Sequence, residues 1–212
     1  MTHAIAVSPT ERVPAVLPLA LLEAVRGLDR PVPDALDEVH GELTAKRLGL
    51  SRTVEVQIER LVRLGPRGRV SADELSALLR LVARRHDASL VFSEAGRRAA
   101  RLALIRLPPG ARTALNLLPR PMRDRGGFAL AARLAERVLG LRLARLDGIA
   151  TASRLGAGGG RDSESGPACA FYGAAMAELL RALTAFDGAM MHVACRARGD
   201  DGCRWHAAPT PT

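Results

Sequence analysis

Apolar residues recur at the spacing of an α-helix along most of the first two thirds of the chain. The stripe that begins at Leu36 follows Pro33 and Asp34, which are typical helix-start residues. The same spacing recurs in four later stretches, at Val54–Val62, Leu75–Val82, Ser93–Leu104 and Phe128–Leu139. The first of these also alternates like a strand, so its pattern fits either structure. Ser71 and Glu74 form a capping box ahead of the second.

The pattern changes after residue 140, where we expect short strands and one further helix. Leu141–Leu146 is expected to be a strand, and the Gly- and Ser-rich residues 153–168 a loop. Met190–Arg198 and Cys203–Ala207 alternate like the two arms of a β-hairpin. Between loop and hairpin, one apolar stripe predicts an amphipathic helix, with members Tyr172, Met176, Leu179 and Leu183.

Helices and strands do not alternate regularly, so a doubly wound sheet is not expected. We predict an α+β fold with helices packed on an antiparallel sheet, in a single domain. Residues 1–15 hold little periodicity and are expected to be a flexible tail. Residues 16–140 form the mainly helical part, and residues 141–208 form the C-terminal part of the same domain.

The composition limits which kinds of binding partner are expected. Hydrophobic residues make up 48% of the 212 residues, which is enough for a real core. The net charge is +9, but Lys46 is the only lysine, aromatic residues are 3%, and no block of basic residues occurs. We therefore expect no nucleic-acid binding. Without an export signal or an apolar stretch of roughly 20 residues, we expect a cytoplasmic protein with no transmembrane segment, at most peripheral at a membrane.

Three cysteines offer the clearest candidate chemistry. Cys169 begins the predicted C-terminal helix, where the helix dipole favours a thiolate. Cys195 and Cys203 lie in the two arms of the predicted hairpin. The three sulfurs could converge on one metal ion, and zinc suits such sulfur-rich coordination. The alternative is that three buried cysteines simply fill the core.

A zinc ion held by three sulfurs needs a fourth ligand. The candidates that the sequence offers are Asp147, Glu164, His206 and, in addition, His192. Side chains alternate across a hairpin, so Cys195 and Cys203 point to opposite faces if Arg198 pairs with Cys203. Metal binding therefore predicts an odd-length turn or a bulge in the hairpin.

The segment Cys195-Arg-Ala-Arg-Gly-Asp-Asp-Gly-Cys203-Arg-Trp205 resembles the end of the 4-vinyl reductase domain family. That family ends on a cysteine, a small residue, a Gly-Asp turn, a second cysteine and an aromatic residue. Gly166–Gly173 resembles its cysteine-led helix. The resemblance implies an α+β fold shared with transport-particle subunits, an apolar pocket and a homodimer. In relatives that sense aromatic compounds, cysteines matching Cys169, Cys195 and Cys203 bind zinc with an acidic residue.

The resemblance also implies a role in bacteriochlorophyll biosynthesis and photosynthesis. The family label implies a 4-vinyl reductase, but the chain shows no flavin signature or nicotinamide motif, and the glycines at 156–160 do not join a strand to a helix. We therefore expect an accessory protein that binds a magnesium tetrapyrrole and supports 8-vinyl (4-vinyl) reduction or substrate delivery. Magnesium chelatase or the pathway methyltransferase would be its partner. The reductase itself and a small-molecule sensor or scaffold are the alternatives.

A flat tetrapyrrole needs an apolar pocket with a few polar groups. The stripe of the C-terminal helix is the candidate ligand-binding wall, and plain core packing is its alternative; its members are Tyr172, Met176, Leu179 and Leu183. Arginines would bind the propionate groups through paired hydrogen bonds.

Overall fold

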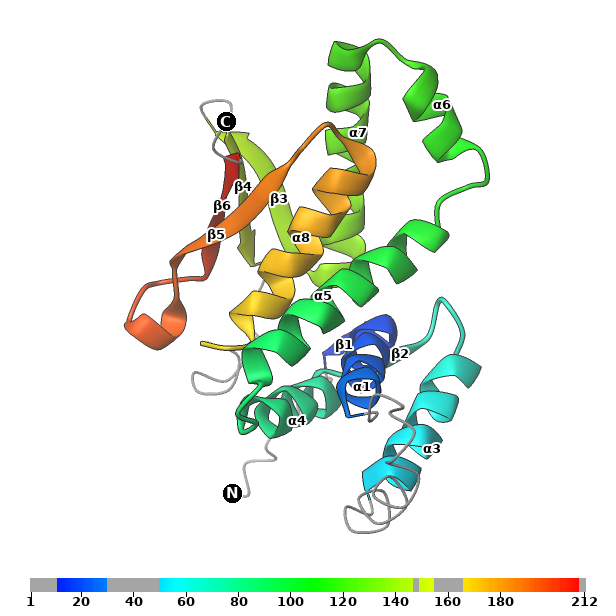
Figure 1. Cartoon of the computed structure of the whole chain (residues 1–212), viewed down its shortest axis with the longest axis vertical. Helices are drawn as coiled ribbons and strands as arrows, with labels where there is room; N and C mark the ends of the chain where they lie inside the picture. Colours follow the sequence, from blue (N-terminus) through cyan, green and yellow to red (C-terminus); the bar gives the residue numbers. More distant parts are fainter. Residues whose placement is uncertain (1–10, 30–49, 147–148, 155–165, 210–212) are drawn as a thin grey trace, which may run out of the picture.

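The computed structural model describes residues 11–29, 50–146, 149–154 and 166–209, and it confirms the α+β class (Figure 1). Its helical elements are α1 (Val16–Leu28), α3 (Leu50–Arg63), α4 (Ala72–Ala83), α5 (Ala88–Ile105), α6 (Ala111–Leu117), α7 (Arg120–Leu134), the π-helical turn η1 (Ala135–Leu139), α8 (Cys169–Leu183) and the 3-10 turn η2 (Arg196–Arg198). Its strands are β1 (Arg12–Pro14), β2 (Arg69–Ser71), β3 (Leu141–Leu146), β4 (Ile149–Arg154), β5 (Gly188–Ala194) and β6 (Arg204–Pro209).

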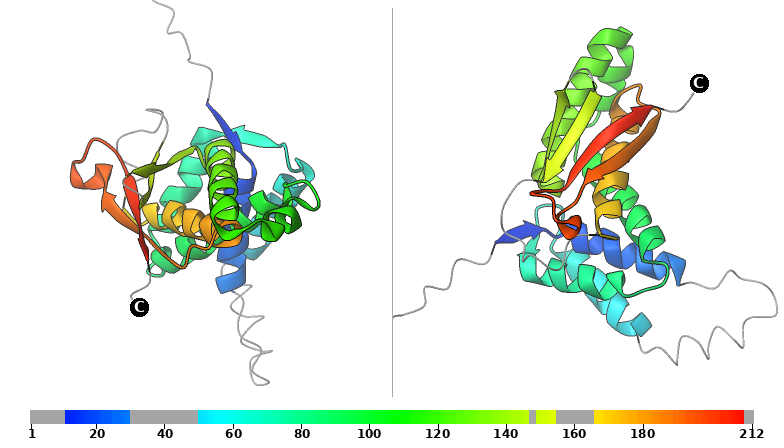
Figure 2. Two further views of the ribbon diagram at one scale, coloured as in Figure 1. Left: turned by 90° about the horizontal axis from the view of Figure 1, so that it is seen from above. Right: turned by 90° about the vertical axis from the view of Figure 1, so that its left-hand side faces the viewer.

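Four antiparallel strands form the main sheet in the order β3-β4-β6-β5. The right-hand view of Figure 2 shows these strands side by side, with α8 and α5 behind them. α8 packs against β5, α7 against β3, α5 against α8, and α1 against α5. The main core therefore lies between the sheet and this stack of helices, and β1 and β2 form a separate two-stranded sheet.

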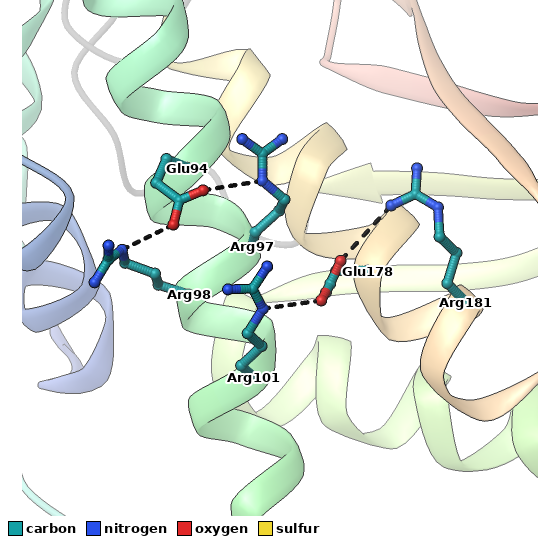
Figure 3. Close-up of polar contacts among 6 residues, drawn as sticks. All are labelled: Glu94, Arg97, Arg98, Arg101, Glu178 and Arg181. Carbon is teal, nitrogen blue, oxygen red and sulfur yellow. Dashed lines mark hydrogen bonds and ion pairs between the residues drawn. The ribbon is translucent and has the colours of Figure 1, made fainter. Parts of the chain in front are cut away.

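Small residues allow the helices to approach one another closely. A Cβ atom on Gly96 of α5 would lie 2.1 Å from the carbonyl oxygen of Phe171 in α8. Beside this contact, Arg101 of α5 donates to the Glu178 carboxylate of α8 at 3.0 Å (Figure 3). Glu178 also pairs with Arg181 of its own helix. Close backbone packing thus joins α5 to α8, and the ion pairs lie at its exposed rim.

Local signals explain several element boundaries. The Ser71 hydroxyl accepts a hydrogen bond from the backbone N–H of Glu74 at 3.1 Å, as the capping box predicted, although the Glu74 carboxylate pairs with Arg60. The ambiguous Val54–Val62 stretch is helical, because it lies within α3. Pro121 is the second residue of α7 and lies in its first turn, where a missing N–H costs nothing, so it does not interrupt the helix.

Other boundaries differ from the sequence-based expectation. Residues 12–14, in the expected tail, pair with β2. α5 begins at Ala88, five residues before Ser93. Strand β4 occupies positions from 149 onward that no periodicity indicated. The helix expected near Leu36 lies outside the described residues.

Candidate metal centre

The three cysteines lie close together, and each stands at the end of a helix or strand. Cys169 is the first residue of α8, Cys195 directly follows β5, and Cys203 directly precedes β6. The start of α8 and this end of the β5–β6 hairpin lie on the same side of the molecule (Figure 1). All three side chains are buried, with exposed fractions of 2%, 2% and 6%. The predicted convergence of the cysteines is therefore present.

The distances between the sulfur atoms match a shared metal ion. Cys169 Sγ lies 4.0 Å from Cys195 Sγ and 3.7 Å from Cys203 Sγ. A disulfide would require about 2.05 Å, and none of these three described cysteines forms one. Sulfurs bound at about 2.3 Å to one tetrahedral ion lie about 3.8 Å apart. The spacing therefore fits tetrahedral coordination.

His192 supplies the fourth ligand atom in this group. One ring nitrogen of His192 and the three sulfurs all lie within 4.8 Å of one another. His192 Nε2 is buried and has no hydrogen-bond partner. The Ala194 backbone, next but one along the strand, partly offsets the fall in the pKa of this ring. In a metal-bound histidine the second ring nitrogen is commonly held by a backbone carbonyl or a carboxylate.

A β-bulge turns His192 toward the cysteines. His192 pairs with Trp205, but Ala194 pairs with Arg204, so one extra residue stands on β5 at position 193. In a regular strand, residues three apart would face opposite sides. The extra residue shifts the alternation by one position, so that His192 and Cys195 face the same side. The shared face of Cys195 and Cys203 has a different origin, the expected odd-length turn. Ala194 pairs with Arg204, so seven residues, 196–202, separate two cysteines that stand opposite each other.

The turn after β5 is fixed by its own hydrogen bonds. The Cys195 carbonyl accepts from the N–H groups of Arg198 and Asp200, at 2.9 and 3.2 Å. The Asp200 carboxylate accepts from the Cys195 N–H at 2.6 Å. Gly199 adopts φ 93°, which a glycine tolerates without strain. Cys195 is thus held in place by a rigid turn.

The surroundings of Cys169 and Cys195 shift the pKa values of their thiols. Burial raises the pKa of the Cys169 thiol well above its usual value, and the neighbouring Cys203 and Cys195 raise it further. For Cys195, burial opposes ionisation, but backbone hydrogen bonds from Gly166 and Ala197 bring the pKa below its usual value. A metal ion supplies the charge that stabilises several adjacent thiolates.

The histidine is already in the form that binds metals. Burial lowers the pKa of His192, and the nearby Arg198 lowers it further. Its ring stacks on the buried Trp205, with centroids 5.1 Å apart and planes inclined by 23°. The neutral, oriented imidazole fits the needs of a ligand to a transition metal or zinc ion.

The fourth ligand differs from those that the sequence placed first. His206 lies on β6 next to Trp205, so alternation directs it to the opposite face, where it is exposed. His206 is therefore not part of the cluster. Asp147 and Glu164 lie outside the described residues. His192 stands three residues before Cys195, a spacing that would place the two side chains on opposite faces of a regular strand. Only the bulge, which the sequence pattern did not reveal, brings them to the same side.

The apolar stripe of α8 forms core and not an open wall. Its members are buried to 3% exposure or less within the main core, and they are Tyr172, Met176, Leu179 and Leu183. The core-packing alternative therefore describes these four side chains in this structure.

Comparisons with known proteins do not assign the chain to a family. No family profile, curated protein or solved structure matches the chain. Among the described residues, no helix is long and apolar enough to cross a membrane.

Proposed function

We propose that Cys169, His192, Cys195 and Cys203 bind one zinc ion that fixes the β5–β6 hairpin to the start of α8. The observation that carries this proposal is the group of three sulfurs and one ring nitrogen of His192, which all lie within 4.8 Å of one another. The buried Nε2 atom of this histidine has no hydrogen-bond partner. Three sulfurs and one imidazole form a common structural zinc set.

The site is structural and not catalytic. Four protein ligands complete a tetrahedron, whereas catalytic zinc sites keep one position for water or substrate. The ligands come from the start of α8 and from the β5–β6 hairpin. The two most distant in sequence, Cys169 and Cys203, are 34 residues apart. One ion would therefore cross-link the start of α8 to the hairpin, whereas the far end of α8 is joined to β5 by the hydrogen bond from Arg181 to the Gly188 carbonyl.

The substitution Cys203→Ser tests this role. It should leave the chain with far less zinc than the wild type's about one ion per chain, because serine is a poor zinc ligand. Its melting temperature should also fall, since metal binding contributes to folding free energy. Metal content by mass spectrometry and thermal unfolding measure both effects.

A chelator supplies the control. It should lower the melting temperature of the wild type and leave that of Cys203→Ser nearly unchanged, because the variant has no zinc to lose. Equal chelator effects on the two proteins, or a wild type without zinc, would contradict the proposal.

We further propose that the chain is an accessory protein of bacteriochlorophyll biosynthesis, which binds a magnesium tetrapyrrole and supports 8-vinyl reduction or substrate delivery. The support is the resemblance of Cys195–Trp205 to the end of the 4-vinyl reductase domain. Within that family the chain most resembles the bacteriochlorophyll biosynthesis J protein. The chain contains no recognisable nicotinamide or flavin motif, which favours a carrier over the reductase itself.

A spectral titration separates these roles. The protein is mixed with a divinyl magnesium tetrapyrrole, and the absorbance band is followed before and after NADPH is added. A saturable shift without conversion is the expected result. Conversion to the monovinyl spectrum would identify a reductase. The absence of any shift would contradict both and leave the sensor or scaffold alternative.

A further inference from the structure

A second site with different chemistry lies where the β1–β2 sheet meets the end of α5 and the turn η1. It is an open cleft of about 440 Å³. Its lining residues are Pro14, Pro66, Arg67, Gly68, Arg69, Arg106 and Arg137. None of these belongs to the metal centre, so the cleft is a separate feature.

The cleft gathers positive charge without a counter-charge. Four of its lining residues are arginines, and no carboxylate lines it. Ion pairs engage many other arginines of this chain, such as Arg85 and Arg98. Across the part of the chain that the structure describes, none of the four cleft arginines forms an ion pair with an acidic residue. Partial desolvation lowers the pKa of Arg106, and no neighbouring acid offsets it.

The backbone around the cleft is well held. Pro14 of β1 pairs with Arg69 of β2, and the Ala15 N–H donates to the Gly68 carbonyl at 2.9 Å. The Arg69 guanidinium donates to the Arg12 carbonyl at 2.6 Å, which orients one arginine and leaves its other N–H groups available. The cleft is therefore framed by the paired strands and by the turn before β2, which the Gly68 N–H closes by donating to the Gly65 carbonyl at 3.0 Å.

Arg67 lies in the turn before β2, and the remaining two arginines come from helix ends. Arg106 is the C-cap of α5, and Arg137 lies within the π-helical turn η1. A π-helical turn is uncommon and is frequent at functional sites, because it redirects side chains within a helix. Here it ends in Gly140 at φ 64° and contributes Arg137 to the cleft.

We propose that this cleft binds a small oxyanion that carries two or more charged groups of the phosphate or carboxylate type. Guanidinium groups match both groups through paired N–H···O hydrogen bonds. Several guanidinium groups converging from separate segments suit a ligand with more than one anionic group. The proposal is independent of the zinc site and of tetrapyrrole binding.

Calorimetric titration with inorganic pyrophosphate and with citrate tests the proposal and separates the two sources of oxyanion. The double variant Arg106→Gln/Arg137→Gln removes two guanidinium groups from two walls. Arg80→Gln/Arg84→Gln is the control, because it removes the same charge from exposed positions at the end of α4. That end precedes the start of α5, and the 18 residues of α5 place Arg106 about 27 Å further on.

Wild type should bind at least one of the two probes saturably, and the tighter probe identifies the phosphate or the carboxylate type. Arg106→Gln/Arg137→Gln should weaken that binding by about tenfold or more, since hydrogen bonds between charged partners are the stronger class. The control should change it less than threefold at constant ionic strength. No saturable binding of either probe would overturn the proposal, as would equal weakening by both double variants. Unfolding curves of the variants show that each remains folded.

Discussion

Each ligand of the metal centre owes its position to a local feature of the backbone. Cys169 is fixed by the start of α8, and Cys195 by the turn that its own carbonyl and the Asp200 carboxylate close. His192 depends on a single extra residue in β5 and on the stacked ring of Trp205. A small backbone irregularity thus brings His192 to the same side as the cysteines.

Loss of a residue that only orients a metal ligand lowers metal affinity by about 10- to 100-fold. Replacing His192 itself with glutamine should reduce zinc affinity by more than this. His206→Gln should leave affinity unchanged, because His206 is exposed and lies outside the cluster. Competition against a chromophoric chelator measures both. Equal affinities for the two variants would remove His192 from the ligand set.

A second residue-scale effect concerns Asp87 at the start of α5. Hydrogen bonds from the Arg85 guanidinium, at 2.8 and 2.9 Å, lower the pKa of the Asp87 carboxyl. A lowered pKa in the folded state stabilises the fold above the carboxyl's ordinary pKa, near 4, and this contribution is lost as pH falls through the folded value.

The variant Asp87→Asn should therefore be less stable than wild type at neutral pH. The difference should shrink as the pH is lowered from about 6 toward 3, because protonation removes the charge from wild type as well. Thermal unfolding across this range measures it. A stability difference that stays constant with pH would show that the charge of Asp87 does not matter.

Among the elements, close contacts between helix backbones determine how the sheet is covered. Gly96 allows α5 to reach α8, and Gly127 allows α7 to reach the end of α8. A Cβ atom on Gly127 would lie 1.8 Å from the Leu183 carbonyl oxygen, which cannot move without the helix. The ion pairs of Figure 3 sit beside these contacts, and pairs this exposed contribute little.

Two adjacent glycines of α7 provide a matched comparison. Gly127→Ala should destabilise the protein by about 1–3 kcal/mol or more, because the added methyl group overlaps backbone. Gly126→Ala should be neutral or stabilising by up to about 1 kcal/mol. Its new methyl group meets only the flexible end of Leu115, at 3.3 Å. Urea unfolding measures both, and similar values for the two variants would contradict the packing of α7 on α8.

At the scale of the whole molecule, the metal centre belongs to the main core. Cys169, Cys195 and Cys203 are buried in the same cluster as the apolar faces of α1, α5 and α8. A smaller cluster joins α3 to α1 and β2 and does not contain any cysteine. Loss of the metal should therefore loosen the sheet and α8 before the region around α3.

The sequence predicted the α+β class, the capping box at Ser71 and the start of the last helix at Cys169, because each of these depends on neighbouring residues. It ranked His206 above His192, because the bulge at position 193 is a property of the pairing between β5 and β6. It also could not show how deeply Cys169 is buried, since that burial comes from tertiary packing. Long-range pairing and burial account for what the sequence alone did not show.

X-ray absorption at the zinc edge, measured on the purified full chain, tests the metal centre most directly. The proposed site predicts zinc bound by three sulfurs at about 2.3 Å and by one imidazole nitrogen at about 2.0 Å. His192→Gln should lose the nitrogen signal of the imidazole and keep the sulfur shell wherever zinc remains bound. A shell of oxygen and nitrogen atoms without sulfur, or a chain free of zinc, would contradict the account.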